Sequence, residues 1–366
     1  MAFSLLCHAA RRPLFRALKV LIAASRVVRL NRPYDGDVIV QGIRRSANKL
    51  YVSLPLSPET LSQGEQSLFW ADRKGHAVVS PIAETHSSVE YEVTRCFRNE
   101  PKVGDKAWLS GWLAETPEDL GMLNYETVEL PNRTKAWLFQ GNTTWVIHVH
   151  GRKAAKAETL RGIKALLPFG FTQLSISHES DPIPEGLGYP RSYFGVKESI
   201  QIANAVSFAE SRGAIRIILY GWSLAGLFIK EYLANNQSSA SVSAVILDSP
   251  LIDLKETLEL QSLNAGLEEQ FGSDVYEALS RSKLLKILGF ARSRVPTLKE
   301  FSFNMPLLLM YSRTDGYVSM KSIDSISSAK LLTRVEFNDS RHCRLFNSDP
   351  EKYRSGLVAF MNSLEK

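Results

Sequence analysis

Three residues that lie far apart in the chain have the types and the order that acyl-transfer chemistry requires. They are Ser223, Asp315 and His342. A serine hydroxyl attacks a carbonyl carbon efficiently when a histidine removes its proton and an acidic side chain orients that histidine. The sequence therefore predicts Ser223 as the nucleophile, His342 as the general base and Asp315 as the acid that holds the base.

The serine lies in a segment suited to a tight turn. The hexapeptide Gly221-Trp222-Ser223-Leu224-Ala225-Gly226 follows the β-branched apolar run 215–220 and precedes residues of helical pattern. A nucleophile elbow between a strand and a helix needs small residues two positions before and two positions after the serine. Gly221 and Ala225 meet this requirement, although glycine is usual at the second position. The start of the helix also favours negative charge beside Ser223.

An earlier strand offers donors for the oxyanion that such chemistry develops. The apolar run 145–149 ends in His150-Gly151-Arg152. We expect one donor to be the backbone N–H of Arg152 and the other to be the backbone N–H of Leu224. Together these parts are sufficient for acyl transfer. The sequence therefore predicts no metal and no organic cofactor.

The assignment of the acid has an alternative. Asp248 also follows a strand-like run, so it is a second candidate for the acid that orients His342. Asp339 is nearer to His342 in sequence, but it lies in the same short loop and is not preferred. No histidine follows residue 178 except His342, so the base has little competition.

Other reactive residue types in these segments receive structural interpretations. His148 and His150 alternate to one side of a strand, but no Asp or Glu at ligand spacing completes a metal site with them. His178 and Asp181 follow the next strand and could line the pocket, but a solvated loop is the preferred interpretation. Cys343 is expected to be structural, because no separate base is evident for a thiolate.

The elements that must position these residues follow a regular order. Strand-like runs alternate, from the third run onward, with helical or long segments, which predicts a mostly parallel, doubly wound sheet with helices on both faces. Amphipathic helices are predicted at 193–211, with Val196, Ile200, Ala203 and Val206 on the apolar stripe, and at 350–364, with Tyr353, Leu357, Phe360 and Leu364 on the stripe. The strand-like runs are 125–130, 134–139, 144–149, 171–177, 215–220, 243–248, 306–311 and 333–337.

The chain divides into three parts by pattern. Residues 1–34 form a basic amphipathic segment, residues 35–120 form a small β-rich extension with short strand-like runs between 66 and 113, and residues 121–366 form the main domain. Within the main domain, residues 251–303 are too many for a simple crossover. Their leucine-rich, charged composition predicts a helical cap over the site.

Charge is concentrated at the amino end. Residues 1–34 contain seven Arg or Lys and no acid, whereas the remainder has 37 basic and 38 acidic residues. This distribution argues against a nucleic-acid partner for the main body. The basic helix is predicted to lie on an anionic membrane surface or to be a targeting segment; the alternative is that it covers an apolar strip of its own protein. The three cysteines are widely spaced, which argues against a disulfide framework.

The motifs together resemble those of the α/β-hydrolase superfamily, and more closely the bacterial prolyl-oligopeptidase-like and serine aminopeptidase-like hydrolases. The resemblance covers about residues 125–366 and rests on His150-Gly151, the elbow at 221–226, Leu247-Asp248-Ser249-Pro250, Arg313-Thr314-Asp315, and His342 with Asn347 and Asp349-Pro350. It implies the α/β-hydrolase fold. With the predicted triad, we expect a serine hydrolase that acts on a small-molecule carboxylic ester or related acyl substrate. Its expected location is cytoplasmic, or peripheral to the membrane if residues 1–34 bind there.

The same parts serve other functions on this fold. The alternatives are a serine peptidase, an acyltransferase, or a non-catalytic binding protein at a membrane surface. The pattern specifies neither the acyl group nor the oligomeric state.

Overall fold

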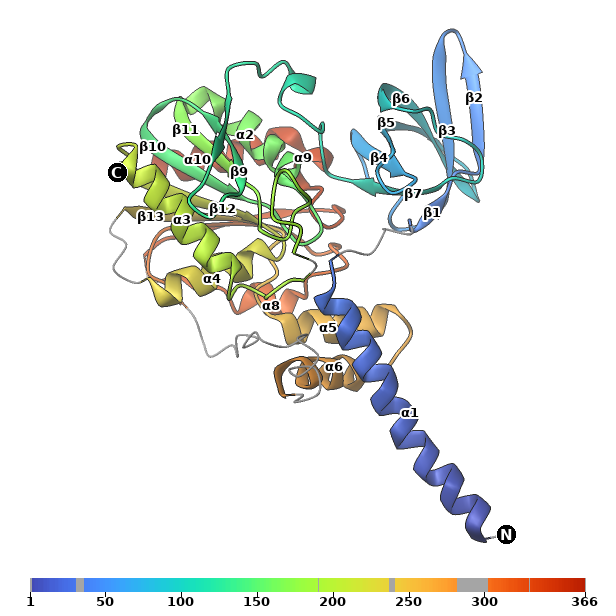
Figure 1. Ribbon diagram of the computed structural model, residues 1–366. Helices are drawn as coiled ribbons and strands as arrows, with labels where there is room; N and C mark the ends of the chain where they lie inside the picture. Colours follow the sequence, from blue (N-terminus) through green and yellow to red (C-terminus); the bar gives the residue numbers. More distant parts are fainter. Residues whose placement is uncertain are drawn as a thin grey trace.

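The computed structural model describes residues 2–30, 36–189, 191–236, 241–281, 302–328 and 330–365. Figure 1 shows an antiparallel sheet beside a larger sheet that is flanked by helices, with the amino-terminal helix α1 (Ala2–Val28) projecting away from both. The two sheets are formed by consecutive parts of the chain. Each has apolar residues that are buried within its own layers.

The smaller sheet contains seven strands, all antiparallel, in the order β1-β7-β4-β5-β6-β3-β2. One of its faces encloses a cluster that includes Val52, Leu68 and Tyr91. The predicted β-rich character of this part is present from residue 38, earlier than the runs recognised in the sequence. The strands are β1 (Val38–Ile39), β2 (Gly42–Ser46), β3 (Lys49–Pro55), β4 (Gln66–Trp70), β5 (Gly75–Glu84), β6 (Ser88–Arg98) and β7 (Lys106–Ser110).

The larger sheet contains eight strands in the order β17-β15-β13-β12-β10-β11-β9-β8. Pairing is parallel from β17 to β11 and antiparallel from β11 to β8, so the sheet is mixed. Each strand-like run recognised in the sequence coincides with one of these strands. They are β8 (Glu126–Glu129), β9 (Lys135–Phe139), β10 (Asn142–Val149), β11 (Phe171–Ile176), β12 (Arg216–Trp222), β13 (Val242–Asp248), β15 (Leu307–Ser312) and β17 (Leu332–Phe337). A separate parallel pair joins β14 (Ser302–Phe303) and β16 (Ser327–Ser328).

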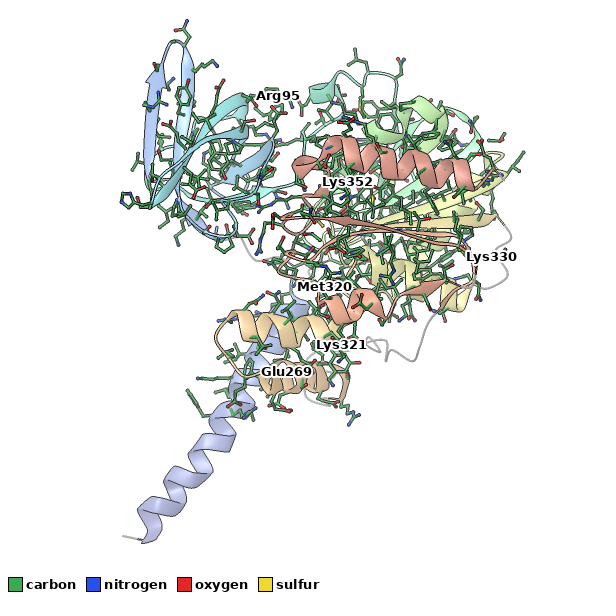
Figure 2. The ribbon with its side chains drawn as sticks, turned by 180° about the vertical axis from the view of Figure 1, so that it is seen from behind. Arg95, Glu269, Met320, Lys321, Lys330 and Lys352 are labelled. Carbon is green, nitrogen blue, oxygen red and sulfur yellow. The ribbon has the colours of Figure 1, made fainter. Side chains whose placement is uncertain are left out.

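Helices cover the two faces of the larger sheet because alternate residues of its strands point to opposite sides. Ile217 and Leu219 face one apolar cluster, whereas Ile218 and Tyr220 face the other. The first cluster includes residues of α3 (Glu198–Ser211), α4 (Ala225–Asn235) and α8 (Met320–Asp324); the second includes residues of α2 (Leu160–Leu166) and α10 (Pro350–Ser363). Figure 2 shows α10, with Lys352 labelled, along the sheet. Shorter helical turns are η1 (Glu118–Leu120), η2 (Lys156–Thr159), η3 (Leu167–Phe169) and α9 (Leu345–Ser348).

Helix α3 differs from its prediction in start and in buried stripe. It begins at Glu198, because Phe194 and Gly195 have positive φ and interrupt a helix at 193–197. Its buried residues include Ile202, Ala205 and Ala209, whereas Ile200 is exposed. The predicted stripe was therefore wrong at Ile200. The carboxy-terminal helix α10 buries Tyr353, Leu357 and Phe360 as predicted.

The predicted cap is helical in the part that the structure describes. It contains α5 (Leu254–Asn264) and α6 (Glu269–Arg281), while residues 282–301 of the predicted insertion lie outside the described residues. Asp253 caps α5 by accepting a hydrogen bond from the Glu256 N–H at 3.1 Å. Helix α8 is linked to α5 by an ion pair between Lys321 and Glu256.

The carboxyl half of α1 packs against the body of the protein on one side and is exposed on the other. Toward its carboxyl end Val20, Ala24 and Val28 are buried in the same cluster as residues of α6, as expected for a helix that covers part of its own protein. Toward its amino end Phe15 and Leu18 are 59% and 54% exposed. None of the described helices is both long enough and apolar enough to cross a bilayer.

Candidate active site

Ser223 occupies a strained turn at the carboxyl end of β12. Its φ is +54°, a left-handed conformation that is uncommon for residues other than glycine, and α4 starts two residues later. The turn is tight, because a Cβ on Gly221 would lie 2.6 Å from Ile229 Cδ1 and 3.2 Å from Ala225 Cβ. These contacts give the physical reason for small residues on both sides of the serine.

The structure brings the three predicted residues into one hydrogen-bonded chain. His342 Nε2 lies 2.8 Å from Ser223 Oγ, and His342 Nδ1 lies 2.9 Å from both carboxylate oxygens of Asp315. The backbone supports this contact, since the His342 N–H donates to the Asp315 carbonyl oxygen at 3.1 Å. Ser223, Asp315 and His342 follow β12, β15 and β17, whose carboxyl ends lie at the same edge of the sheet.

Asp315 is held in the orientation that this contact needs. Its side chain is 2% exposed, and its Oδ1 accepts hydrogen bonds of 2.9 Å from the backbone N–H groups of Tyr317 and Val318. The Tyr317 ring lies beside the His342 ring, with centroids 5.0 Å apart. Burial alone lowers the pKa of His342, but the Asp315 carboxylate outweighs it, so the pKa is raised above its ordinary value of 6.5.

The two residues that were predicted to supply oxyanion donors lie beside Ser223, one in the chain and the other after a glycine that adjoins the serine. Leu224 directly follows the serine at the start of α4, and Arg152 follows Gly151, where a Cβ would lie 3.0 Å from Ser223 Cβ. Neither N–H donates to another of the described residues. The Gly151 N–H donates to Glu158 Oε2 at 2.9 Å, which fixes the start of this loop.

The Arg152 side chain has its partners outside the candidate site. Its Nη2 donates to the carbonyl oxygens of Val27 at 2.6 Å and Arg29 at 3.0 Å, at the carboxyl end of α1. At the carboxyl end of a helix the last carbonyl oxygens have no N–H partner within the helix, so the positively charged guanidinium donates hydrogen bonds to them. Only the backbone of Arg152 thus belongs to the candidate site.

The alternative acid lies in a different environment. Asp248 is buried, and its oxygens accept hydrogen bonds from Tyr353 at 2.7 Å and from Ser249 at 2.9 Å. Burial raises the pKa of Asp248. Since His342 Nδ1 lies 2.9 Å from both oxygens of Asp315, the structure places Asp315, and not Asp248, in contact with His342.

A second buried polar network lies behind the Gly151 loop. His150 Nε2 lies 2.9 Å from Asp181 Oδ2, and His178 Nε2 lies 3.0 Å from the His150 carbonyl oxygen. The expectation that His178 and Asp181 lie in a solvated loop was therefore wrong, because both are buried. Their position just after β11, level with the end of β10, was the signal that could have indicated this contact.

The remaining candidates have structural partners. His148 Nε2 lies 2.9 Å from Gln173 Oε1, and burial lowers the pKa of His148 to about 3. Burial raises the pKa of Cys343 to about 11, which keeps the thiol protonated at neutral pH. Across the described ranges, no group of three or more His, Cys, Asp or Glu side chains is arranged to hold a metal ion.

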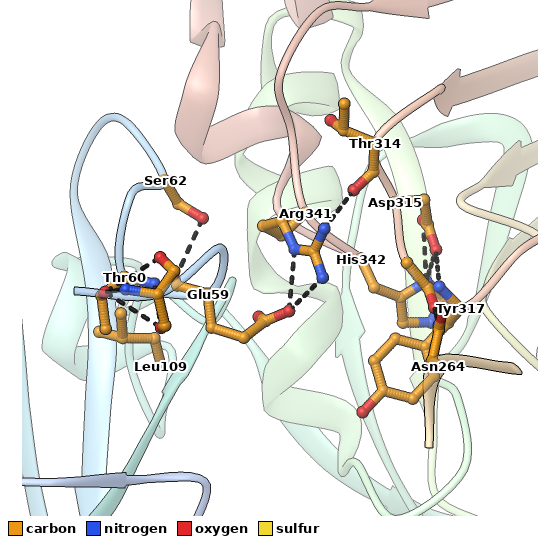
Figure 3. A network of polar contacts seen from close by, with 12 residues as sticks. Glu59, Thr60, Ser62, Leu109, Asn264, Thr314, Asp315, Tyr317, Arg341 and His342 are labelled. Carbon is orange, nitrogen blue, oxygen red and sulfur yellow. Dashed lines mark hydrogen bonds and ion pairs between the residues drawn. The ribbon is translucent and has the colours of Figure 1, made fainter. Parts of the chain in front are cut away.

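Sequence reasoning missed three charged residues beside the site. Figure 3 shows Glu59, from the loop between β3 and β4, reaching Arg341, which directly precedes His342. Arg344 also contacts Glu59, with Nη2 to Oε2 at 2.9 Å. The residues are more than 280 positions apart in the chain. The one signal in the sequence was that two charged residues, Arg341 and Arg344, lie next to His342.

Comparisons with known proteins support the fold. Residues 40–110, within the antiparallel sheet, match a family model described only as a domain of unknown function. A comparison with curated protein sequences finds no match. Among solved structures, an esterase of Pyrococcus furiosus has a TM-score of 0.51 at 19% sequence identity, covering 68% of this chain and 94% of that protein.

Two further solved structures match with lower scores. An esterase of Rhodococcus has a TM-score of 0.45 at 16% identity and covers 66% of this chain and 100% of that one. A proline iminopeptidase-related protein of Thermus thermophilus has a TM-score of 0.47 at 15% identity, with 66% and 97% covered. The fold assignment rests on the Pyrococcus match together with the strand order and the turn at Ser223. By these criteria, this chain has the α/β-hydrolase fold.

Proposed function

We propose that this protein is a serine hydrolase that cleaves a carboxylic ester or a related acyl compound. The observation that carries the proposal is the hydrogen-bonded chain from Ser223 through His342 to Asp315, with distances of 2.8 Å and 2.9 Å. Its order of carboxylate, imidazole and hydroxyl is the one that activates a serine nucleophile. The similarity to an esterase supports the fold on which this chemistry is common, and the activity is inferred from the side chains.

In the acylation step, Ser223 Oγ forms a bond to the substrate carbonyl carbon while its proton passes to His342 Nε2. Asp315 accepts from Nδ1–H and stabilises the imidazolium. The negative oxygen of the tetrahedral intermediate accepts hydrogen bonds from the N–H groups of Arg152 and Leu224. When the intermediate collapses, the bond to the leaving oxygen breaks and His342 returns its proton to that oxygen.

In the deacylation step, water replaces the alcohol. Its oxygen attacks the acyl carbon, His342 takes the proton, and the bond to Ser223 Oγ breaks as the proton returns to the serine. The products are the carboxylic acid and the regenerated enzyme. An amine leaving group would make the protein a peptidase, and an alcohol acceptor in place of water would make it an acyltransferase.

A fluorophosphonate probe tests the proposal directly, because it forms a stable bond only with an activated serine. We expect the protein to be labelled at Ser223 and Ser223→Ala to lose labelling. Ser211→Ala, which changes an exposed serine at the end of α3, is the matched control and should label like the unchanged protein. Labelling that survives in Ser223→Ala would contradict the proposal.

Substrate panels separate the alternatives. Turnover of acyl esters that exceeds turnover of aminopeptide amides favours an esterase, and the reverse favours a peptidase. Product transfer to an added alcohol identifies an acyltransferase. Absence of both labelling and turnover would favour the non-catalytic binding protein.

A further inference from the structure

Glu59 links the antiparallel sheet to the loop that carries the general base. It lies between β3 and β4, and its Oε1 accepts hydrogen bonds from Nε of Arg341, at 2.8 Å, and from Nη2 of the same residue. Its other oxygen accepts from Arg344 Nη2 at 2.9 Å. One carboxylate thus holds the arginines on both sides of His342. Figure 3 shows its contact with Arg341.

The loop that carries His342 has a backbone that needs support. Asp339 and Cys343 have φ values of +50° and +55°, in the left-handed region that residues with a side chain rarely adopt. Such conformations persist where surrounding contacts hold them in place. Because these two residues flank His342, the position of the imidazole depends on contacts outside the loop.

Arg341 joins this loop to the one that carries the acid. Its Nη1 donates to the Thr314 carbonyl oxygen at 2.7 Å, one residue before Asp315. Its other nitrogens donate to Glu59. The guanidinium therefore ties together the loop of the base, the loop of the acid and the antiparallel sheet.

Arg344 binds the antiparallel sheet through the backbone as well. Its side chain is only 6% exposed, and it donates to the carbonyl oxygens of Glu59 and Leu109 at 2.8 Å each, and to Ser62 Oγ at 3.0 Å. All of these acceptors come from residues 59–109. A buried guanidinium that lost these acceptors would be destabilised, and it lies two residues from His342.

We propose that the antiparallel sheet is a positioning element for the base, and that Glu59 is its positioning residue. The carboxylate fixes Arg341 and Arg344, and through them it holds the His342 imidazole between Ser223 and Asp315. The inference rests on the proposed function, because the arrangement it maintains is the catalytic one. It also assigns a role to the segment that matches the domain of unknown function.

A positioning role and a purely structural role predict different changes. A residue that only joins two sheets changes the unfolding temperature and leaves kcat of the folded protein unaltered. A residue that positions the base lowers kcat of the folded protein, while KM stays nearly constant because the substrate pocket is unchanged. Displacement of a catalytic group by about 1 Å is sufficient for a loss of roughly 100-fold.

The test uses Glu59→Ala and Glu59→Gln in the full chain. We expect kcat and the rate of fluorophosphonate labelling to fall by about 10- to 100-fold in Glu59→Ala, with KM within about twofold. Glu59→Gln keeps one carbonyl oxygen as an acceptor, so its kcat and labelling rate should lie between those of the unchanged protein and those of Glu59→Ala. It also provides a variant if the alanine protein does not fold. Glu90→Ala is the control, since it removes an ion pair with Arg44 on the same sheet, away from His342.

The outcomes separate this inference from the proposed function. If the unchanged protein is labelled and folded Glu59 variants are labelled at the same rate, the positioning role is wrong while the hydrolase proposal stands.

If the unchanged protein shows no labelling and no turnover, the hydrolase proposal fails. The low-field proton resonance of the His342 Nδ1–H then decides the positioning role. That resonance, assigned with His342→Gln, should broaden or disappear in Glu59→Ala and persist in Glu90→Ala. An unchanged resonance in Glu59→Ala overturns the inference.

Discussion

The two aspartates near Ser223 show how environment separates residues of the same type. Asp315 accepts from two backbone N–H groups and contacts the imidazole, whereas Asp248 accepts from Tyr353 and Ser249. The first arrangement stabilises a charged carboxylate beside a histidine. The second is a buried anchor between β13 and α10. The role of each aspartate therefore depends on its partners and not on its place after a strand.

Replacing Asp315 tests this assignment. We expect Asp315→Asn to lower the acylation rate by about 10⁴-fold, because the amide favours the wrong imidazole tautomer. Asp248→Asn is the comparison, and its acylation rate should remain much closer to that of the unchanged protein. Labelling kinetics with a fluorophosphonate measure both. A large loss with Asp248→Asn and a small loss with Asp315→Asn would transfer the role to Asp248.

The same substitution has a pH signature. The base acts in its neutral form, and Asp315 raises the pKa of His342 above 6.5, so kcat/KM should increase as pH rises through a midpoint above 6.5. An amide in place of the Asp315 carboxylate carries no charge to favour the imidazolium. The midpoint of the residual activity should therefore move to lower pH in Asp315→Asn, as measured by kcat/KM profiles. A midpoint that does not move would show that Asp315 is not the charge that sets it.

At the scale of elements, the junction of β12 and α4 determines where the serine lies. Its geometry depends on close contact between Gly221, Ala225 and Ile229. Gly221→Ala would place a methyl group 2.6 Å from Ile229 Cδ1, and we expect it to lower the free energy of unfolding by about 1–3 kcal/mol. Urea denaturation measures this change.

A second substitution identifies the cause. Ile229→Val removes Cδ1, so the double variant Gly221→Ala/Ile229→Val should be more stable than the sum of the two single effects predicts. Additive effects would mean that the contact with Ile229 is not the source of the destabilisation.

Helices and strands were predictable where the hydrophobic pattern of their own residues identifies them. The strand-like runs identified all eight strands of the larger sheet. Inner strands such as β12 and β15 are buried on both sides, which leaves a continuous apolar signal, whereas the edge strand β8 is mostly exposed. The start of α3 was not predictable, since positive φ at Phe194 depends on contacts of the surrounding loop. Strand β2 was missed because the charged residues Arg44 and Arg45 leave it without an apolar alternation. Strand β3 was also missed, although Leu50, Val52 and Leu54 alternate along it.

At the scale of the whole molecule, the carboxyl half of α1 packs on the body through Val20, Ala24 and Val28. We propose that the exposed side of this half contacts anionic membrane surfaces. Phe15, Leu18 and Ile22 are exposed, and Lys19 Nζ lies 4.6 Å from the centre of the Phe15 ring. An apolar strip bordered by basic residues binds the interface of an anionic bilayer. The charge of Arg16 is less available for membrane binding, since its Nη2 lies 2.9 Å from Asp274 Oδ2 of α6.

Vesicle binding tests this surface without disturbing the packed side. We expect Phe15→Ser/Leu18→Ser to reduce co-sedimentation with vesicles that contain phosphatidylserine. Leu123→Ser is a matched control, because Leu123 is also exposed but lies between the two sheets in sequence. Equal sedimentation of both variants and the unchanged protein would remove the membrane proposal.

The sequence by itself determined which segments form the larger sheet and which residues lie at the ends of its strands. These properties depend on neighbouring residues, so the local pattern was sufficient to place Ser223, His342 and two candidate aspartates, Asp248 and Asp315, after strands. The tertiary structure decided which aspartate contacts His342, that His150 and Asp181 form a buried pair, and that Glu59 reaches Arg341 and Arg344. Such contacts depend on the paths of loops and on the docking of two sheets. A hydrophobic pattern records whether a residue is buried, but it does not record which distant residue is its partner.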